Sequence, residues 1–164
     1  MRHHSLYGIV IWATLALVGP GTTSADAQNR VGGHFGVLFP IVTHANDTTT
    51  DISDDFVIGF PVGITVRKSP TFAFDLELVP VIQNEPLDVS LEIHPGVLYG
   101  FAEGWNAGIR MAFGVNQASW GFTPLLNYGD SVFAEVVLPI RFREDGFGDG
   151  YTSIGFGVHL GVGF

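Results

Sequence analysis

Bulky apolar residues alternate with small or polar residues along most of this chain, and residues 151–164 show the alternation most clearly. From Thr152 onward every second residue except the first is apolar, and the residues between them are glycines apart from Ser153 and His159. A period of two residues is typical of a β-strand whose two faces differ. Residues 151–164 are therefore predicted to form a strand with one bulky apolar face and one face of small residues.

The same pattern predicts eight strands. The sixth is the least regular because Pro124 interrupts it, and we take Trp120, Phe122, Pro124 and Leu126 as its outer face. Prolines inside strands mark edges or bulges, and a curved, closed sheet tolerates bulges. The predicted strands are 31–43, 56–67, 72–82, 88–101, 105–115, 119–127, 132–143 and 151–164, and prolines that fall inside them include Pro61, Pro80, Pro95, Pro124 and Pro139.

The connections between the predicted strands differ in length. Those after the second, fourth and sixth strands are short turns, whereas residues 44–55 form a long polar segment that we expect to be solvated and mobile. Short turns at one end, longer loops at the other and an even strand count are expected of a bacterial up-and-down barrel. Nine acidic residues lie in or beside the loops of the second end: Asp47, Asp51, Asp54, Asp55, Glu85, Asp88, Glu144, Asp145 and Asp149.

The predicted last strand ends on an aromatic residue, Phe164. A closing strand with this alternation and a terminal Phe resembles that of bacterial outer-membrane β-barrels, in which the terminal aromatic belongs to the signal read by the outer-membrane assembly machinery. The resemblance implies this signal role for Phe164 and makes that machinery an expected partner. In pattern the whole mature chain resembles the small eight-stranded members of this family, which implies the outer membrane of a Gram-negative bacterium.

The N-terminal segment agrees with export. Arg2 precedes a mostly apolar run over residues 6–18, and Ala25-Asp26-Ala27 supplies small residues at the spacing of a signal-peptidase site. We predict a signal peptide over 1–27, cleaved after Ala27, and a barrel domain over 28–164. An uncleaved anchor helix is the alternative, but the run is shorter than the roughly 20 residues that a spanning helix needs. The sequence has no cysteine, so neither disulfides nor a lipoprotein attachment site are expected.

Composition excludes some functions. Seven Lys and Arg against 16 Asp and Glu give a formal net charge of −9, which argues against nucleic-acid binding and against a basic membrane-surface patch. No apolar run after residue 27 is long enough for a membrane helix. If the chain crosses a bilayer, only a closed barrel satisfies its backbone groups there.

The charges of the predicted strands all fall on the small-residue face. A soluble barrel has an apolar interior and a polar exterior, so this chain is predicted to turn its bulky, uncharged face to lipid. Four acids and four bases would then face the lumen and neutralise one another. Eight strands leave a lumen that side chains fill, so we expect a plugged lumen. The predicted lumen charges are Arg67, Asp75, Glu77, Glu92, Arg110, Glu135, Arg141 and Arg143.

Aromatic residues of the bulky face gather at the strand ends. Such clusters are expected where a barrel meets the two membrane interfaces, although aromatics also favour strands in general. The group at the turn end is Phe72, Tyr99, Phe101, Trp105, Tyr128 and Phe164, and the group at the loop end is Phe39, Phe56, Phe113, Trp120, Phe122 and Phe142.

Three groups of residues have side chains of the kind found in chemical sites. Ser90, Glu92 and His94 share one face, but alternate residues step about 6.6 Å along a strand, too far for direct contact between a nucleophile and its base. His34, His94 and His159 face inward, and hydrogen-bonded histidines are favoured over a metal site, which needs three or four ligands. A calcium site in the acidic segment 44–55 is disfavoured because the ligand spacing is irregular. No catalytic, metal or cofactor site is expected.

The sequence therefore predicts an all-β protein: an eight-stranded antiparallel transmembrane β-barrel, an up-and-down meander, after a cleaved signal peptide. We expect a monomer in contact with outer-membrane lipid and lipopolysaccharide, with a structural or surface-interaction role through its acidic external loops. Two alternatives stay open. One is a narrow channel for small solutes or ions, and the other is a soluble periplasmic lipid-binding β-barrel or sandwich. Fold alone does not fix function.

Overall fold

The computed structural model describes residues 31–84, 86–144 and 150–164. The predicted signal peptide and the acidic residues Glu85, Asp145 and Asp149 lie outside these ranges. Among the described residues, no helix is long and apolar enough to cross a membrane. The strands are β1 Val31–Ala45, β2 Thr48–Asp51, β3 Val57–Gly59, β4 Val62–Arg67, β5 Phe72–Gln83, β6 Asp88–Ala102, β7 Trp105–Gly114, β8 Ser119–Gly129, β9 Val132–Val137, β10 Ile140–Glu144 and β11 Gly150–Gly163.

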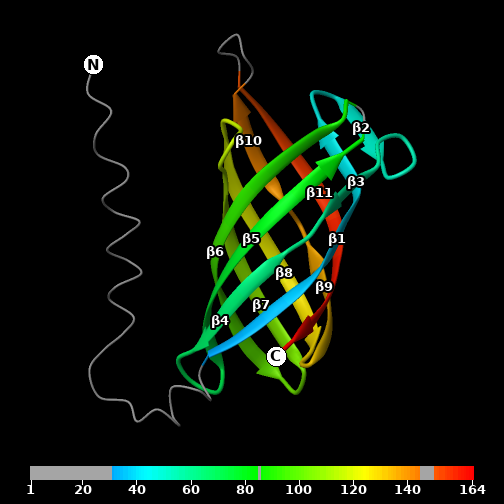
Figure 1. Cartoon of the computed structure of the whole chain (residues 1–164). Coiled ribbons are helices and arrows are strands. Elements are labelled where there is room, and N and C mark those ends of the chain that lie inside the picture. Colours follow the sequence, from blue (N-terminus) through cyan, green and yellow to red (C-terminus); the bar gives the residue numbers. More distant parts are fainter. Residues whose placement is uncertain (1–30, 85, 145–149) are drawn as a thin grey trace, which may run out of the picture.

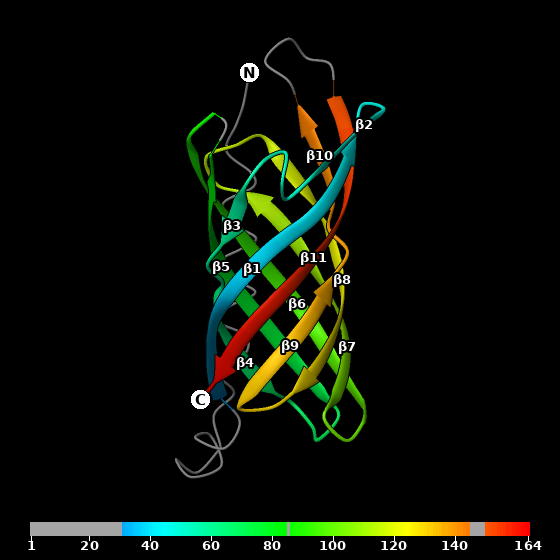
Figure 2. The same cartoon turned by 90° about the vertical axis from the view of Figure 1, so that its right-hand side faces the viewer.

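These strands form a closed antiparallel barrel (Figure 1). β3 and β4 together make one barrel strand, as do β9 and β10, whereas β2 is a short addition outside the cycle, so eight strands surround the lumen. The barrel closes where β1 pairs with β11, from His34 opposite Gly163 to Ala45 opposite Ser153, and Figure 2 shows these two strands side by side. The predicted all-β, eight-stranded antiparallel barrel is confirmed.

Two prolines interrupt barrel strands and four do not. Pro61 separates β3 from β4, and Pro139 separates β9 from β10. Proline has no N–H to donate to the ladder, but the carbonyl groups of both residues still accept bonds from the neighbouring strand, Pro61 from Gly36 at 2.9 Å and Pro139 from Gly155 at 2.8 Å. The remaining strand prolines, Pro40, Pro80, Pro95 and Pro124, lie within continuous strands, and the register of β1 against β11 shifts between Pro40 and Val42. The sixth strand is thus more regular and longer than predicted.

The polar segment 44–55 differs from its prediction as a mobile loop. β2 pairs with the end of β1, from Val42 opposite Asp51 to Ala45 opposite Thr48. The two turn residues, Asn46 and Asp47, have φ angles of 49° and 60°, which Asn and Asp tolerate better than most residues. The segment is therefore a β-hairpin that prolongs β1, and its residues are mostly exposed to solvent as expected.

The barrel has an apolar outside and a polar middle. Among the described residues, 29 large hydrophobic side chains are exposed, whereas the buried hydrophobic residues are only Ala73, Val79, Ala112, Leu125 and Val137. The buried polar residues outnumber them and are His34, Asp75, Glu77, Glu92, His94, Arg110, Thr123, Glu135, Arg141, Ser153 and His159. The packed interior of this protein is thus built from charged and polar side chains.

Candidate functional site

Arg110 lies at the centre of the barrel interior and is 3 % exposed. Its guanidinium, projecting from β7, donates to Asp75 Oδ2 at 2.7 Å and to Glu135 Oε1 at 2.6 Å and Oε2 at 3.2 Å. Its Nη2 also lies 3.1 Å from Glu77 Oε1. One guanidinium therefore ties together β5, β7 and β9 through charge-assisted hydrogen bonds, the strongest kind available to side chains.

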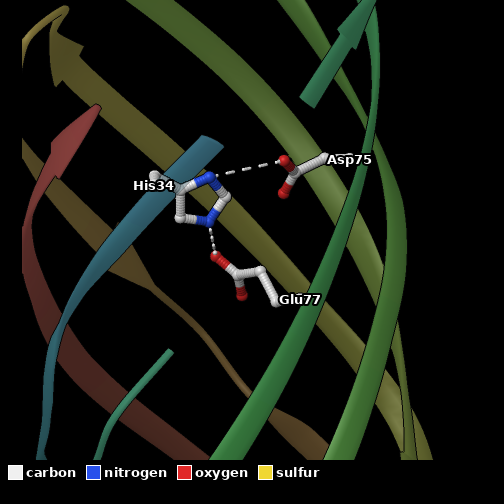
Figure 3. Close-up of side chains that lie close together, drawn as sticks. All are labelled: His34, Asp75 and Glu77. Atoms are coloured by element: carbon white, nitrogen blue, oxygen red, sulfur yellow. Dashed lines mark hydrogen bonds and ion pairs between the residues drawn. The ribbon is translucent and has the colours of Figure 1, made fainter. Parts of the chain in front are cut away.

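His34 of β1 approaches two of these carboxylates, and Figure 3 shows the group. Its Nε2 lies 2.9 Å from Glu77 Oε1, and its Nδ1 lies 4.0 Å from Asp75 Oδ1. The hydroxyl of Thr65 donates to the same Asp75 oxygen at 2.7 Å. Both carboxylates therefore have partners from β1 or β4 in addition to Arg110.

A second group of charges lies toward the loop end. His94 Nε2 is 2.7 Å from Glu92 Oε2, and Arg141 Nη2 is 3.0 Å from the same oxygen. Arg141 also donates to the hydroxyl of Thr123 at 2.9 Å. His94 Nδ1 lies 3.7 Å from Glu77 Oε2, so Glu77 links this group to the one around Arg110.

His159 of β11 completes the set. Its Nδ1 lies 3.3 Å from Glu135 Oε1, and the ring of Phe133 packs edge-on against it at 5.0 Å. Its other ring nitrogen, Nε2, is buried without a hydrogen-bond partner. We call the following nine residues the lumen network: His34, Asp75, Glu77, Glu92, His94, Arg110, Glu135, Arg141 and His159.

Glycines of the inward face give these side chains their space. A Cβ added to Gly63 would collide with the ring of His34, and one added to Gly36 would collide with that of His159. A Cβ on Gly96 would lie 2.6 Å from Cγ of Arg110. Glycine therefore occupies those positions of the inward face where a long side chain from the neighbouring strand lies across the backbone.

Six of the eight predicted lumen charges meet in the lumen network. The other two, Arg67 and Arg143, lie near the ends of β4 and β10. Arg67 is exposed and lies 3.7 Å from Asp130 of a turn, whereas Arg143 is half-buried with no hydrogen-bond partner for its Nε. The expected balance of four acids and four bases does not hold, because both of these arginines stand at strand ends rather than mid-barrel.

The network therefore contains four carboxylates, two guanidiniums and three histidines. The inward direction of His34, His94 and His159 follows from strand alternation, but their carboxylate partners do not. The expectation that alternate residues of one face lie too far apart for direct contact is wrong for Glu92 and His94, because these two side chains are long enough to meet. No sequence signal pointed to Thr65 and Thr123 as partners, because threonine is common in strands.

Phe164 pairs with β1 at the turn end. Its N–H donates to the Gly33 carbonyl at 2.9 Å, and its carbonyl accepts from the Gly33 N–H at 2.7 Å. The residue is 81 % exposed, and the centroid of its ring lies 6.5 Å from that of Phe35. The aromatic side chain is therefore on the outside of the barrel, where another protein can contact it.

Two groups of ligand-type atoms lie close enough together for a metal ion: His34, Asp75 and Glu77, and Glu77, Glu135 and His159. Arg110 already lies 2.6 to 3.1 Å from a carboxylate oxygen of each of these three acids. A dication would have to approach within a few ångströms of that buried positive charge. The arrangement favours an ion-pair network over a metal site.

The lumen network separates two cavities. The cavity at the turn end, of about 270 Å³, is lined by His34, Thr65 and Asp75, among others. The cavity at the loop end, of about 260 Å³, is lined by Glu77, Glu92, His94, Arg141 and His159, among others. Arg110 and Glu135 line both. The interior is therefore open from each end and closed at the level of Arg110.

The sequence matches no protein-family model, and a search of curated proteins finds no similar sequence. Function must therefore be argued from the fold and from the chemistry of the lumen.

Proposed function

We propose that this protein is an outer-membrane β-barrel with a plugged lumen and a structural or surface-interaction role through its acidic external loops. The observation that carries this proposal is the reversal of polarity between the two faces. Among the described residues, the outward face between the strand ends carries no charged side chain, whereas buried charges fill the interior.

An outward face of this kind is a poor surface for water. Soluble monomers rarely expose contiguous apolar patches beyond a few hundred Å², and here exposed hydrophobic side chains surround the barrel. A bilayer removes such a face from water, and the closed hydrogen-bonded sheet leaves no edge in the hydrocarbon. Representative outward residues are Phe35, Val62, Ile64, Leu76, Leu78, Tyr99, Ile109, Met111, Trp120, Leu126, Val136, Leu138, Ile154 and Leu160.

Aromatic clusters at the two ends support the same orientation in a membrane. At the turn end the rings of Trp105 and Tyr128 lie 4.7 Å apart. At the loop end Trp120 contacts Phe142 at 4.6 Å and Phe122 at 5.7 Å. Aromatic rings favour the interfaces between lipid and water, so the apolar band between these clusters is the proposed spanning region.

The acidic hairpin suggests which end faces outward. Asp51, Asp54 and Asp55 stand near or beyond the end of the proposed spanning region, together with the other loops. The turns at the opposite end are short, as expected of the periplasmic end of a bacterial barrel. The hairpin would present negative charge to the outside, next to the phosphates of lipopolysaccharide and the divalent cations bound to them.

Membrane fractionation tests the proposal. The full precursor is expressed in a Gram-negative host, and the outer membrane is run on a gel with and without boiling. We expect a detergent-requiring protein whose mobility shifts on heating and whose mature chain begins at Gln28. Recovery from the soluble periplasm without a heat shift would favour the lipid-binding barrel instead.

Conductance separates a plugged barrel from a channel. Because Arg110 holds three carboxylates between the two cavities, we expect no steady unitary current of potassium or chloride in a planar bilayer. Steady currents that disappear when Arg110 or Glu92 is replaced would favour the channel. For the surface role, a variant with Asp51, Asp54 and Asp55 changed to Asn is expected to insert normally and to differ only in contacts at the cell surface.

A further inference from the structure

We propose that His34 and Glu77 of the lumen network transfer protons between the two cavities through the hydrogen bond that joins them, while Arg110 blocks the passage of other ions. This inference rests on the proposed membrane-spanning barrel. It adds an activity, selective proton permeation, to a protein whose lumen is otherwise closed.

The hydrogen bond between His34 and Glu77, drawn in Figure 3, connects the two sides of the lumen at the level where Arg110 closes it. His34 lines the turn-end cavity and Glu77 lines the loop-end cavity, and neither lines both. The 2.9 Å between His34 Nε2 and Glu77 Oε1 is a distance over which a proton passes directly from one atom to the other. A single hydrogen bond therefore connects two spaces that Arg110 keeps apart.

The groups on each side extend this connection. His34 Nδ1 lies 3.5 Å from Thr65 Oγ1 and 4.0 Å from Asp75 Oδ1, both of which line the turn-end cavity. On the other side, Glu77 Oε2 lies 3.7 Å from His94 Nδ1, whose Nε2 is bonded to Glu92. Both cavities have charged side chains in their lining and are much larger than the roughly 30 Å³ share of one water molecule, so water can deliver protons to each side.

Each transfer step balances. A water-borne proton from the turn-end cavity binds His34 Nδ1 and makes the ring cationic. The Nε2–H bond then breaks, and an O–H bond forms at Glu77 Oε1. Glu77 releases this proton to water in the loop-end cavity or to His94 Nδ1. The His34 ring, now protonated only at Nδ1, reorients by rotation about both Cα–Cβ and Cβ–Cγ so that this N–H faces Glu77 and the unprotonated nitrogen faces the turn-end cavity. This restores the starting state, and no oxidant or other reactant is consumed.

Imidazole suits this task because its two nitrogens exchange protons near neutral pH. A metal or halide ion cannot follow the same route. It would have to displace the buried guanidinium of Arg110 from Asp75, Glu77 and Glu135, which would leave these three carboxylates without their shared partner. A proton needs only the existing hydrogen bond.

Other charged groups near this path do not provide a second route for protons. Glu135 lines both cavities by itself, but Arg110 holds both of its oxygens, at 2.6 and 3.2 Å. Its neighbour His159 does not line the turn-end cavity. Arg141 and Glu92 lie on the loop-end side only. His34 and Glu77 are therefore the pair that bridges the plug.

Proton flux into vesicles tests the inference. The mature protein is refolded into phosphatidylcholine and phosphatidylglycerol vesicles that enclose a pH-sensitive dye, and a potassium gradient with valinomycin drives protons inward. Insertion is checked separately by the heat shift on a gel. We expect flux above that of protein-free vesicles, and a fall of about tenfold or more in both H34Q and E77Q.

The matched control is H159Q, which removes a buried histidine that does not bridge the cavities and is expected to keep most of the flux. E77Q preserves the shape of the side chain, so it tests the path if H34Q fails to fold. Inserted wild-type protein without flux, or flux in H34Q and E77Q equal to that of the wild type, would overturn the proton path alone. Loss of flux only in E135Q would overturn the assignment to His34, and failure to insert at all would overturn the barrel proposal as well.

Discussion

The Nη1 atom of Arg110 lies 2.6 Å from Oε1 of Glu135, and this ion pair joins β7 to β9 across β8 inside the barrel. Both side chains are at most 4 % exposed, so each charge is stabilised mainly by its partners in the lumen network. The same guanidinium serves Asp75 and Glu77. Removal of Arg110 therefore leaves three buried carboxylates without their shared partner.

Replacing Arg110 by Met is expected to destabilise the barrel strongly. Breaking a buried ion pair by removing one partner costs about 3 to 5 kcal/mol. The measurement is the urea unfolding of the vesicle-inserted protein, with tryptophan fluorescence as the signal. The matched control is R67M, because Arg67 pairs with Asp130 at the surface and exposed pairs contribute only about 0 to 1 kcal/mol. Equal losses in the two variants would contradict the central role of Arg110.

Adding a methyl group at Gly63 should displace His34. The new Cβ would collide with the imidazole ring and lie 3.0 Å from Cγ of Glu77, and overpacking of this kind costs about 1 to 3 kcal/mol. We expect G63A to unfold at lower urea concentration. G100A is the control, since the atom nearest its Cβ is the side-chain oxygen of Asn106 at 3.2 Å. Equal stability of G63A and wild type would show that the ring has room to move.

The strands and their two faces could be predicted because each depends on a period of two that local sequence carries. The partners of the lumen charges could not be predicted, since they depend on pairing between distant strands. Glu77 and Arg110 meet because β5 and β7 both flank β6, and Arg67 fails to join them because it stands at the end of β4. The hairpin at Asn46 and Asp47 was missed because an acidic, threonine-rich segment reads as a loop, although Asn-Asp suits the positive φ of a tight turn.

The loop residue Asp51 gives a prediction about pH. The Ser53 hydroxyl donates to its carboxylate at 2.6 Å and the Ser53 N–H at 2.7 Å, and these bonds hold the pKa of Asp51 below its usual value. Because the folded pKa is the lower one, the stabilisation is present above the unfolded pKa and is lost as pH falls through the folded pKa. By NMR titration, S53A should raise this pKa, while S53T, which keeps a hydroxyl, should not. An unchanged pKa in S53A would contradict the assigned cause.

Phe164 should matter for assembly more than for stability. The residue is 81 % exposed. Its hydrogen bonds to Gly33 are made by the backbone, so F164A keeps them. In cells we expect less F164A in the outer membrane than wild type. In vitro, the refolded variant should unfold at nearly the same urea concentration, because surface substitutions usually change stability by only about 0.5 kcal/mol. A large loss of stability in vitro would mean that the ring serves packing instead of recognition.

A charge placed on the outward face distinguishes lipid from water as its surroundings. Leu78 lies near the middle of β5 with its side chain 47 % exposed. If lipid surrounds it, L78R should cost about 2 to 4 kcal/mol, as expected for Arg at the midplane of a membrane barrel. If water surrounds it, an exposed Leu to Arg change should be nearly neutral.

The control is L87R, since Leu87 lies at the loop end and is 78 % exposed, where the cost is small in either case. Equal unfolding midpoints for L78R and L87R in vesicles would contradict the spanning orientation, whereas a penalty confined to L78R would support it independently of fractionation.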